Sequence, residues 1–64
     1  MTLQLTVPNM ACAACAAKIT QAVTAIDPTA TIAADPATKL VNVETHQSED
    51  LICAAITAAG YTVQ

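Results

Sequence analysis

Two cysteines three positions apart are the residues of this sequence best suited to chemistry. Cys12 and Cys15 stand in the segment "MACAACAAK", where every other side chain before the lysine is methionine or alanine. Such a pair can form a disulfide, work as a redox dithiol, hold a metal ion between two thiolates, or simply fill a core. The rest of the sequence has to decide among these four possibilities.

Length, cysteine count and the first residues narrow the choice. The chain has 64 residues and three cysteines. A chain of this size predicts one domain, residues 1–64, with little room for a deep substrate cavity. The odd number of cysteines and the absence of a secretory signal pattern argue against a disulfide framework and predict a cytoplasmic protein. A metal-binding or redox role for the close pair is therefore favoured.

The charge balance argues against two classes of partner. Two lysines stand against five acidic residues, which gives a formal net charge of −3. A nucleic-acid-binding domain needs a basic surface, and so does a domain that binds anionic membranes. No apolar run approaches the roughly 20 residues that span a bilayer. We therefore expect no nucleic-acid partner and no membrane insertion.

Hydrophobic periodicity predicts a strand, a helix and a hairpin in the first two thirds of the chain. Residues 2–7 alternate between apolar and polar, as in a half-buried strand. Residues 13–26 carry an apolar stripe with helical spacing, and the Asp27–Pro28 pair ends that helix. Two alternating segments, 29–34 and 39–45, predict a β-hairpin around a short turn.

A second helix and a last strand complete the pattern. Ser48 and two acidic residues predict the start of the helix, and Gly60 its end. Residues 61–64 predict a last short strand. The order βαββαβ is that of a ferredoxin-like α+β sandwich, with two helices on a four-stranded antiparallel sheet.

This topology predicts which segments meet. The 8–14 loop, the 35–38 turn and the Gly60–Tyr61 junction should share one end of the molecule. His46 and the turn after the first helix should lie at the other end. The cysteine pair is therefore expected beside Tyr61 and far from the only histidine.

At this place the two thiols are suited to a thiophilic metal ion. Cys12 is expected in the loop and Cys15 in the first helical turn, where the helix dipole and free N–H groups lower thiol pKa values. Thiolates select copper(I), zinc or other soft ions. Two sulfurs are too few for a closed tetrahedral zinc site but fit the low coordination that copper(I) tolerates. The surrounding alanines leave the sulfurs approachable by the ligands of another protein.

The segments "NMACAAC" and "AAGYTV", together with the βαββαβ order, resemble the heavy-metal-associated domain over essentially the whole chain. Within that family the chain is similar to small bacterial copper chaperones. The resemblance implies that Cys12 and Cys15 bind copper(I) and pass it, by stepwise thiolate exchange, to the N-terminal metal-binding domains of copper-transporting P-type ATPases. The family usually has Gly where this chain has Asn9, and Asn is the residue after Gly that best tolerates a left-handed backbone.

Several other residues have two interpretations each. Met10 is either a third ligand or a core anchor under the loop, and the anchor is favoured. Tyr61 either packs only or contacts the metal site from outside its ligands. Cys53 is expected to be a half-buried small apolar residue, and His46 a solvated loop residue. Lys18 and Lys39 are expected to be solvated, and the alternative for both is a position toward the metal end.

A metallochaperone without catalytic activity is the function that the sequence favours. The start at Met1 and the end directly after the expected last strand favour a free-standing protein over an excised metal-binding domain of a copper ATPase. A small dithiol redox protein is the alternative from the enzyme class, although no proton-relay residue accompanies the pair. Carriage of zinc or mercury stays open. Since two-coordinate copper has room for further thiolates, a copper-bridged homodimer is also expected.

Overall fold

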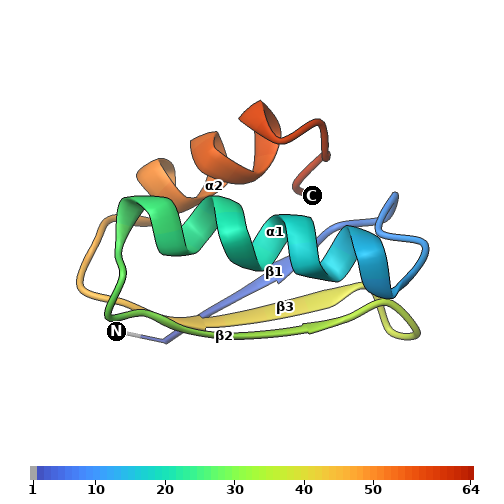
Figure 1. Ribbon diagram of the computed structural model, residues 1–64, viewed down its shortest axis with the longest axis horizontal. Helices are drawn as coiled ribbons and strands as arrows, with labels where there is room; N and C mark the ends of the chain where they lie inside the picture. Colours follow the sequence, from blue (N-terminus) through green and yellow to red (C-terminus); the bar gives the residue numbers. More distant parts are fainter. Residues whose placement is uncertain (1) are drawn as a thin grey trace.

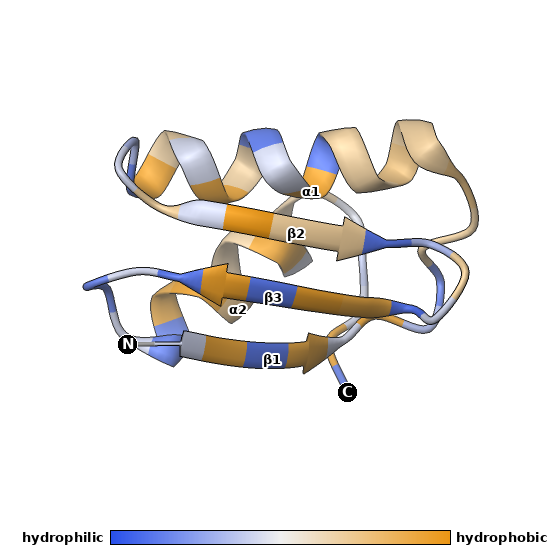
Figure 2. Cartoon of the chain, turned by 90° about the horizontal axis from the view of Figure 1, so that it is seen from below, coloured by the Kyte–Doolittle hydropathy of each residue, from blue (hydrophilic) through white to orange (hydrophobic). Residues whose placement is uncertain are grey.

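Both helices lie on one face of an antiparallel sheet in the computed structural model, which describes residues 2–64 (Figure 1). In chain order the elements are β1 (Thr2–Thr6), α1 (Ala13–Ile26), β2 (Thr31–Asp35), β3 (Leu40–Glu44) and α2 (Glu49–Ala58). The central strand β3 pairs antiparallel with β1 on one side and β2 on the other, as Figure 2 shows. The predicted α+β sandwich is therefore confirmed.

The core lies between the sheet and the two helices. Strand alternation sends apolar side chains inward and polar ones outward, so Val41 and Val43 are fully buried while Asn42 between them is exposed. The helices contribute two buried residues each from their inner stripes. The buried apolar residues are Leu3, Leu5, Val7, Met10, Ile19, Val23, Val41, Val43, Ile52 and Ile56.

The ends of α2 follow from local chemistry in the way the sequence predicts. The Ser48 hydroxyl accepts a hydrogen bond from the Leu51 N–H at 3.3 Å, which caps the first turn. Gly60 has φ of 99°, a left-handed conformation that glycine adopts without strain. The N–H of Gly60 then donates to Thr57 O at 3.0 Å and that of Tyr61 to Ile56 O at 3.2 Å. These two bonds form a Schellman motif that turns the chain sharply toward the cysteine loop.

The predicted fourth strand is wrong. Residues 61–64 have no strand conformation, and the sheet of the described chain has three strands. One backbone bond, from the Gln64 N–H to Thr6 O at 2.8 Å, ties the segment to the end of β1. The Thr62 N–H donates instead to the Asn9 side chain, so a ladder cannot form through it. Val63 still packs half-buried against the core, as its apolar character predicted.

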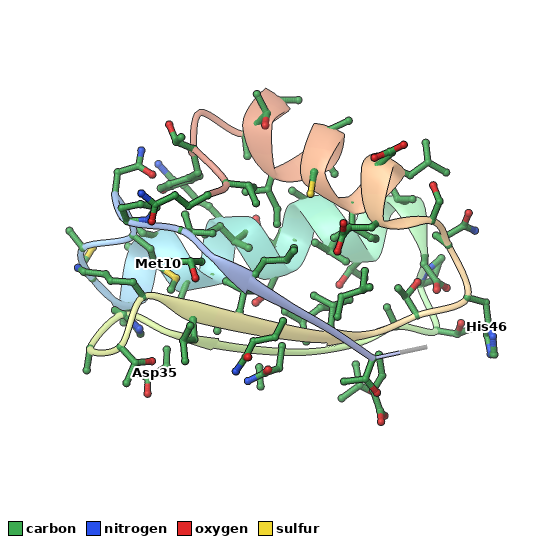
Figure 3. The ribbon with its side chains drawn as sticks, turned by 180° about the vertical axis from the view of Figure 1, so that it is seen from behind. Met10, Asp35 and His46 are labelled. Atoms are coloured by element: carbon green, nitrogen blue, oxygen red, sulfur yellow. The ribbon has the colours of Figure 1, made fainter. Side chains whose placement is uncertain are left out.

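The predicted meeting of three segments at one end of the molecule is confirmed. The Lys39 ammonium donates to Met10 O at 2.7 Å, which joins the turn between β2 and β3 to the cysteine loop. Asn9 bonds to Thr62 and so joins the same loop to the C-terminal segment. His46 lies at the opposite end from Met10 and Asp35 (Figure 3). Within residues 2–64 no helix has the length and apolar character needed to cross a membrane.

Candidate metal centre

The two cysteines of the CxxC segment meet at the N-terminus of α1. Cys12 is the N-cap residue and is exposed, while Cys15 lies in the first turn and is half-buried. Their Sγ atoms are 3.5 Å apart, well beyond the roughly 2.05 Å of a disulfide, and both thiols are free. Because a soft metal sits about 2.3 Å from each thiolate sulfur, one ion can contact both atoms without a change of fold.

Hydrogen bonds favour the thiolate form of Cys15. The Tyr61 hydroxyl is the largest influence, followed by the backbone N–H of Ala11 and the Cys12 side chain, and together they lower the pKa of Cys15 to about 7 against the opposing effect of burial. More of this thiol is therefore ionised at neutral pH than of an ordinary cysteine. A group in this state exchanges its proton for a metal ion readily, because only the thiolate is a ligand.

Tyr61 reaches the cysteines from the segment just after the α2 cap. Its contact with Cys15, its burial and the negative charges of both cysteines raise the pKa of the Tyr61 hydroxyl. The phenol therefore keeps its proton and serves as a hydrogen-bond donor to sulfur. Tyr61 thus lies beside the cysteine pair, as the topology predicted. The influence of Tyr61 on a bound metal stays a prediction.

Met10 has no exposed surface and belongs to the core cluster. Its backbone N–H donates to Val7 O at 3.1 Å, which fixes the turn that leads out of β1. This burial supports the interpretation of Met10 as an anchor beneath the loop rather than a third ligand. The loop is held from below by an apolar side chain, with Cys12 exposed at its end and Cys15 half-buried in the first turn of α1.

The sequence left Lys39 either solvated or turned toward the metal end, and the structure has it half-buried at that end. The side chain is half-buried, and its ammonium donates to Met10 O, two residues before Cys12. Its backbone accepts a bond from the Val7 N–H at 2.8 Å, and its own N–H donates to Asp35 O at 2.8 Å. Its φ of 65° is left-handed, which is uncommon for a residue with a long side chain. No sequence signal announces such a residue, because Gly, Asn or Asp is the usual choice.

The remaining candidates lie away from the pair. His46 is exposed at the opposite end of the molecule (Figure 3). Cys53 is half-buried on α2, where burial and the charges of Glu49 and Asp50 raise the pKa of its thiol. Among residues 2–64, no group of three or more His, Cys, Asp and Glu side chains is placed to hold a metal ion. The candidate centre is therefore a two-sulfur site.

Comparison with models of known protein families identifies the family of this chain. The model of the heavy-metal-associated domain matches residues 4–62. The chain belongs to the heavy-metal-associated domain family. No curated protein matches the chain in a sequence comparison.

Several solved structures superpose on nearly the full chain. A trimeric copper form of the chaperone Atx1 from Synechocystis, a histidine-to-tyrosine variant, is 42% identical with a TM-score of 0.95, covering 97% of this chain and 98% of that one. A cyanobacterial copper metallochaperone in solution is 42% identical with a TM-score of 0.83 over 100% of both chains. A gold-binding protein is 38% identical with a TM-score of 0.92, covering 95% and 94%. The prediction of a carrier without enzymatic activity agrees with relatives that are chaperones.

Proposed function

We propose that this domain is a copper(I) metallochaperone whose cargo is held by Cys12 and Cys15. The observation that carries the proposal is the geometry of the pair, with two free sulfurs 3.5 Å apart at the surface end of α1. The lowered pKa of Cys15, about 7, supplies a thiolate at neutral pH. The similar copper chaperones named above support the choice of metal.

The donor set favours copper(I) over zinc. Zinc in proteins takes four ligands or three and a water, whereas the described residues offer two sulfurs and no group of three ligands. Copper(I) is soft and is served by thiolates at low coordination number. Since a similar solved protein binds gold, competition among thiophilic ions belongs in any test.

Delivery is supported by the exposure of Cys12. Ala11, Ala13 and Ala14 around it are also exposed, so a thiolate that approaches Cys12 meets small side chains there. The incoming cysteine adds to the copper before Cys12 or Cys15 leaves, so that the metal is never without two sulfur ligands. The recipients are the N-terminal metal-binding domains of copper-transporting P-type ATPases. Transfer takes place in the cytoplasm, where free thiols persist.

The same open coordination predicts a copper-bridged homodimer. Two chains that face each other through their cysteine loops can share copper by an isologous contact. Analytical ultracentrifugation should show monomers without metal and dimers with copper(I) at high concentration. A dimer of equal strength without metal would show that a different surface is responsible.

A dithiol redox protein is the second candidate, because a thiol with a pKa of about 7 also suits disulfide exchange. A redox protein needs a disulfide potential within the range of the cytosolic glutathione pool, roughly −220 to −320 mV. Redox titration of the Cys12–Cys15 pair separates the two candidates. A redox enzyme has a potential in this range and reduces a model disulfide catalytically. A metallochaperone binds copper(I) through the reduced pair and does not reduce the model disulfide catalytically.

Anaerobic competition for copper(I) against a colorimetric chelator tests the proposed function. We expect one copper(I) per monomer, lost in Cys12→Ser and in Cys15→Ser. Cys53→Ser is the matched control, since it removes a thiol of the same chain that lies outside the pair, and it should bind as the unmodified protein does. Retained binding in Cys12→Ser would refute the assignment of the pair.

A further inference from the structure

Asn9 connects the cysteine loop to the C-terminal segment through its side chain. The Oδ1 atom accepts a hydrogen bond from the Thr62 N–H at 3.0 Å. The Nδ2 atom donates to Gly60 O at a longer distance of 3.5 Å. The two bonded residues stand on either side of Tyr61 in the sequence. Asn9 therefore holds both neighbours of Tyr61, whose hydroxyl is the first cause of the lowered pKa of Cys15.

The backbone gives no reason for an asparagine at this position. Asn tolerates a left-handed conformation well, yet Lys39 is the one residue other than glycine with positive φ in the described chain. The side chain of Asn9 is exposed, so burial gives no reason either. Its contacts with residues 60 and 62 are made by the carboxamide and would be absent with a side chain that lacks it.

The segment that Asn9 holds has few other ties. It lacks a strand ladder, and its backbone is fixed by the α2 cap at Tyr61 and by one bond from Gln64 to Thr6. A carboxamide carries an N–H donor and a carbonyl acceptor, the same groups as a peptide unit. The Asn9 side chain thus takes the place of a strand pairing partner at the point where Tyr61 leaves the helix.

We propose that Asn9 is a positioning residue, which fastens the Gly60–Thr62 backbone to the cysteine loop and so keeps the Tyr61 hydroxyl at Cys15. The positional part concerns the metal-free protein and stands without any cargo. Its consequence for copper rests on the proposed function. Because the two parts are measured separately, failure of copper binding does not conceal the outcome for Asn9.

Amide hydrogen exchange in the metal-free protein tests the positional part. Asn9→Ala should speed exchange of the Thr62 amide by up to about tenfold, because one hydrogen bond is lost. Nuclear Overhauser contacts between the Tyr61 ring and the Cys15 side chain should weaken in the same variant. Asn42→Ala removes an exposed asparagine on β3 and is the matched control. It should leave the Thr62 exchange rate and the Tyr61–Cys15 Overhauser contacts unchanged. Unchanged Thr62 exchange in Asn9→Ala would overturn the proposal.

A second variant separates the bond from the general effect of a smaller side chain. Asn9→Asp keeps the oxygen that accepts from Thr62 and loses the donor to Gly60. Exchange at Thr62 should stay slow in this variant, as in the unmodified protein. Fast exchange in Asn9→Asp with slow exchange in Asn9→Ala would also overturn the proposal.

The loss of copper(I) to a chelator tests the consequence for cargo. Asn9→Ala and Tyr61→Phe should change the rate by the same factor, and the double variant should show no further change, because both substitutions remove one contact. Tyr61 is the only aromatic residue, so its fluorescence reports the response to copper at this position alone. Additive effects in the double variant would show that Asn9 acts independently of Tyr61.

Discussion

The two ends of this domain each hold an ionisable group whose pKa is lowered by hydrogen bonds, with opposite results. At the end away from the cysteines, bonds from Thr29 and Thr45 lower the pKa of Asp27 to about 2. At the metal end, bonds led by that from Tyr61 lower the pKa of Cys15 to about 7. The carboxylate is buried among its donors, whereas the thiol stands beside an exposed partner.

The two groups differ in whether hydrogen bonds from the chain already occupy their charged atoms. Asp27 Oδ1 accepts bonds from the Thr29 N–H at 3.1 Å and the Thr29 hydroxyl at 2.6 Å, and Oδ2 accepts from the Thr45 hydroxyl at 2.6 Å. Both oxygens are occupied by the chain itself, so Asp27 stabilises the fold. The sulfur of Cys15 receives hydrogen bonds from the protein, while the neighbouring Cys12 remains exposed to solvent. A lowered pKa therefore marks a ligand site only where the charged atom still has room for a partner.

Surface shape would have pointed to the wrong end. A hollow of about 230 Å³ lies beside Asp27 and is lined by Thr29, Thr31, Glu44, Thr45 and His46. Two of these threonines already donate to Asp27. The proposed metal site is instead on the loop with the exposed thiol, because a metal ion bound by two sulfurs needs no cavity.

The largest expected effect concerns the anchor under the metal end. Met10→Ala should lower the free energy of unfolding of the metal-free protein by about 2–5 kcal/mol, since it leaves a cavity in the core. Met10→Leu conserves volume and should cost less than about 1.5 kcal/mol. Urea denaturation measures both. Met10→Leu should bind copper(I) normally in chelator competition, and a loss of binding would show that the thioether is a ligand.

Asp27 should affect stability and leave copper binding unchanged. A carboxyl whose folded pKa is depressed adds stability above its ordinary pKa of 3.8, and that stability disappears as the pH falls through about 2. Asp27→Asn should therefore lower the melting temperature at pH 7 by several degrees. Between pH 3.8 and 2 the melting temperature of this variant should fall less than that of the unmodified protein. Thermal melts across pH, monitored by circular dichroism, measure this. Reduced copper affinity at pH 7 would contradict the independence of the two ends.

Tyr61→Phe removes the main donor to Cys15. The pKa of Cys15 should rise from about 7 toward its ordinary value of 9.0, so the thiolate fraction at pH 7 falls. The pH dependence of alkylation in Cys12→Ser and Cys53→Ser backgrounds isolates this thiol. Copper affinity should change by less than about tenfold, because only one hydroxyl is lost. Tyr61→Lys should do the reverse, with tighter copper retention, since a cation favours the thiolate.

Substitutions of Lys39 should have the smallest effect on stability. They also separate the contribution of its side-chain hydrogen bond from that of its left-handed backbone. Lys39→Ala loses the bond to Met10 O, worth about 0.5–1.5 kcal/mol for a half-exposed group, and keeps the strained left-handed φ. Lys39→Gly loses the same bond and relieves the strain, so its stability should lie closer to that of the unmodified protein. Equal destabilisation in urea by the two substitutions would show that the backbone at Lys39 is not strained.

Much of the fold was predictable because it depends on local patterns. The bounds of α1, the cap at Ser48 and the glycine end of α2 follow from periodicity and from residue types within a few positions. The meeting of the cysteine loop with Tyr61 followed from topology alone. These features need no knowledge of distant side chains.

The rest depends on contacts between residues far apart in the chain. The bond from Thr62 to Asn9 joins positions 53 apart, and it takes the N–H that the predicted fourth strand needed. The left-handed Lys39 is stabilised by its bonds to Val7 and Met10, which no local rule specifies. Side-chain capture of backbone groups at long range is therefore where the sequence-based prediction was wrong.

Copper(I) titration followed by two-dimensional NMR of the labelled protein tests the contrast between the two ends most directly. We predict that amide shifts reach saturation at one copper per chain and are confined to residues 9–16, 37–39 and 60–62. The resonances of Thr29, Thr45 and His46 should not move. Movement of His46 at the same copper level, with Cys12 and Cys15 unaffected, would contradict the assignment of the metal centre.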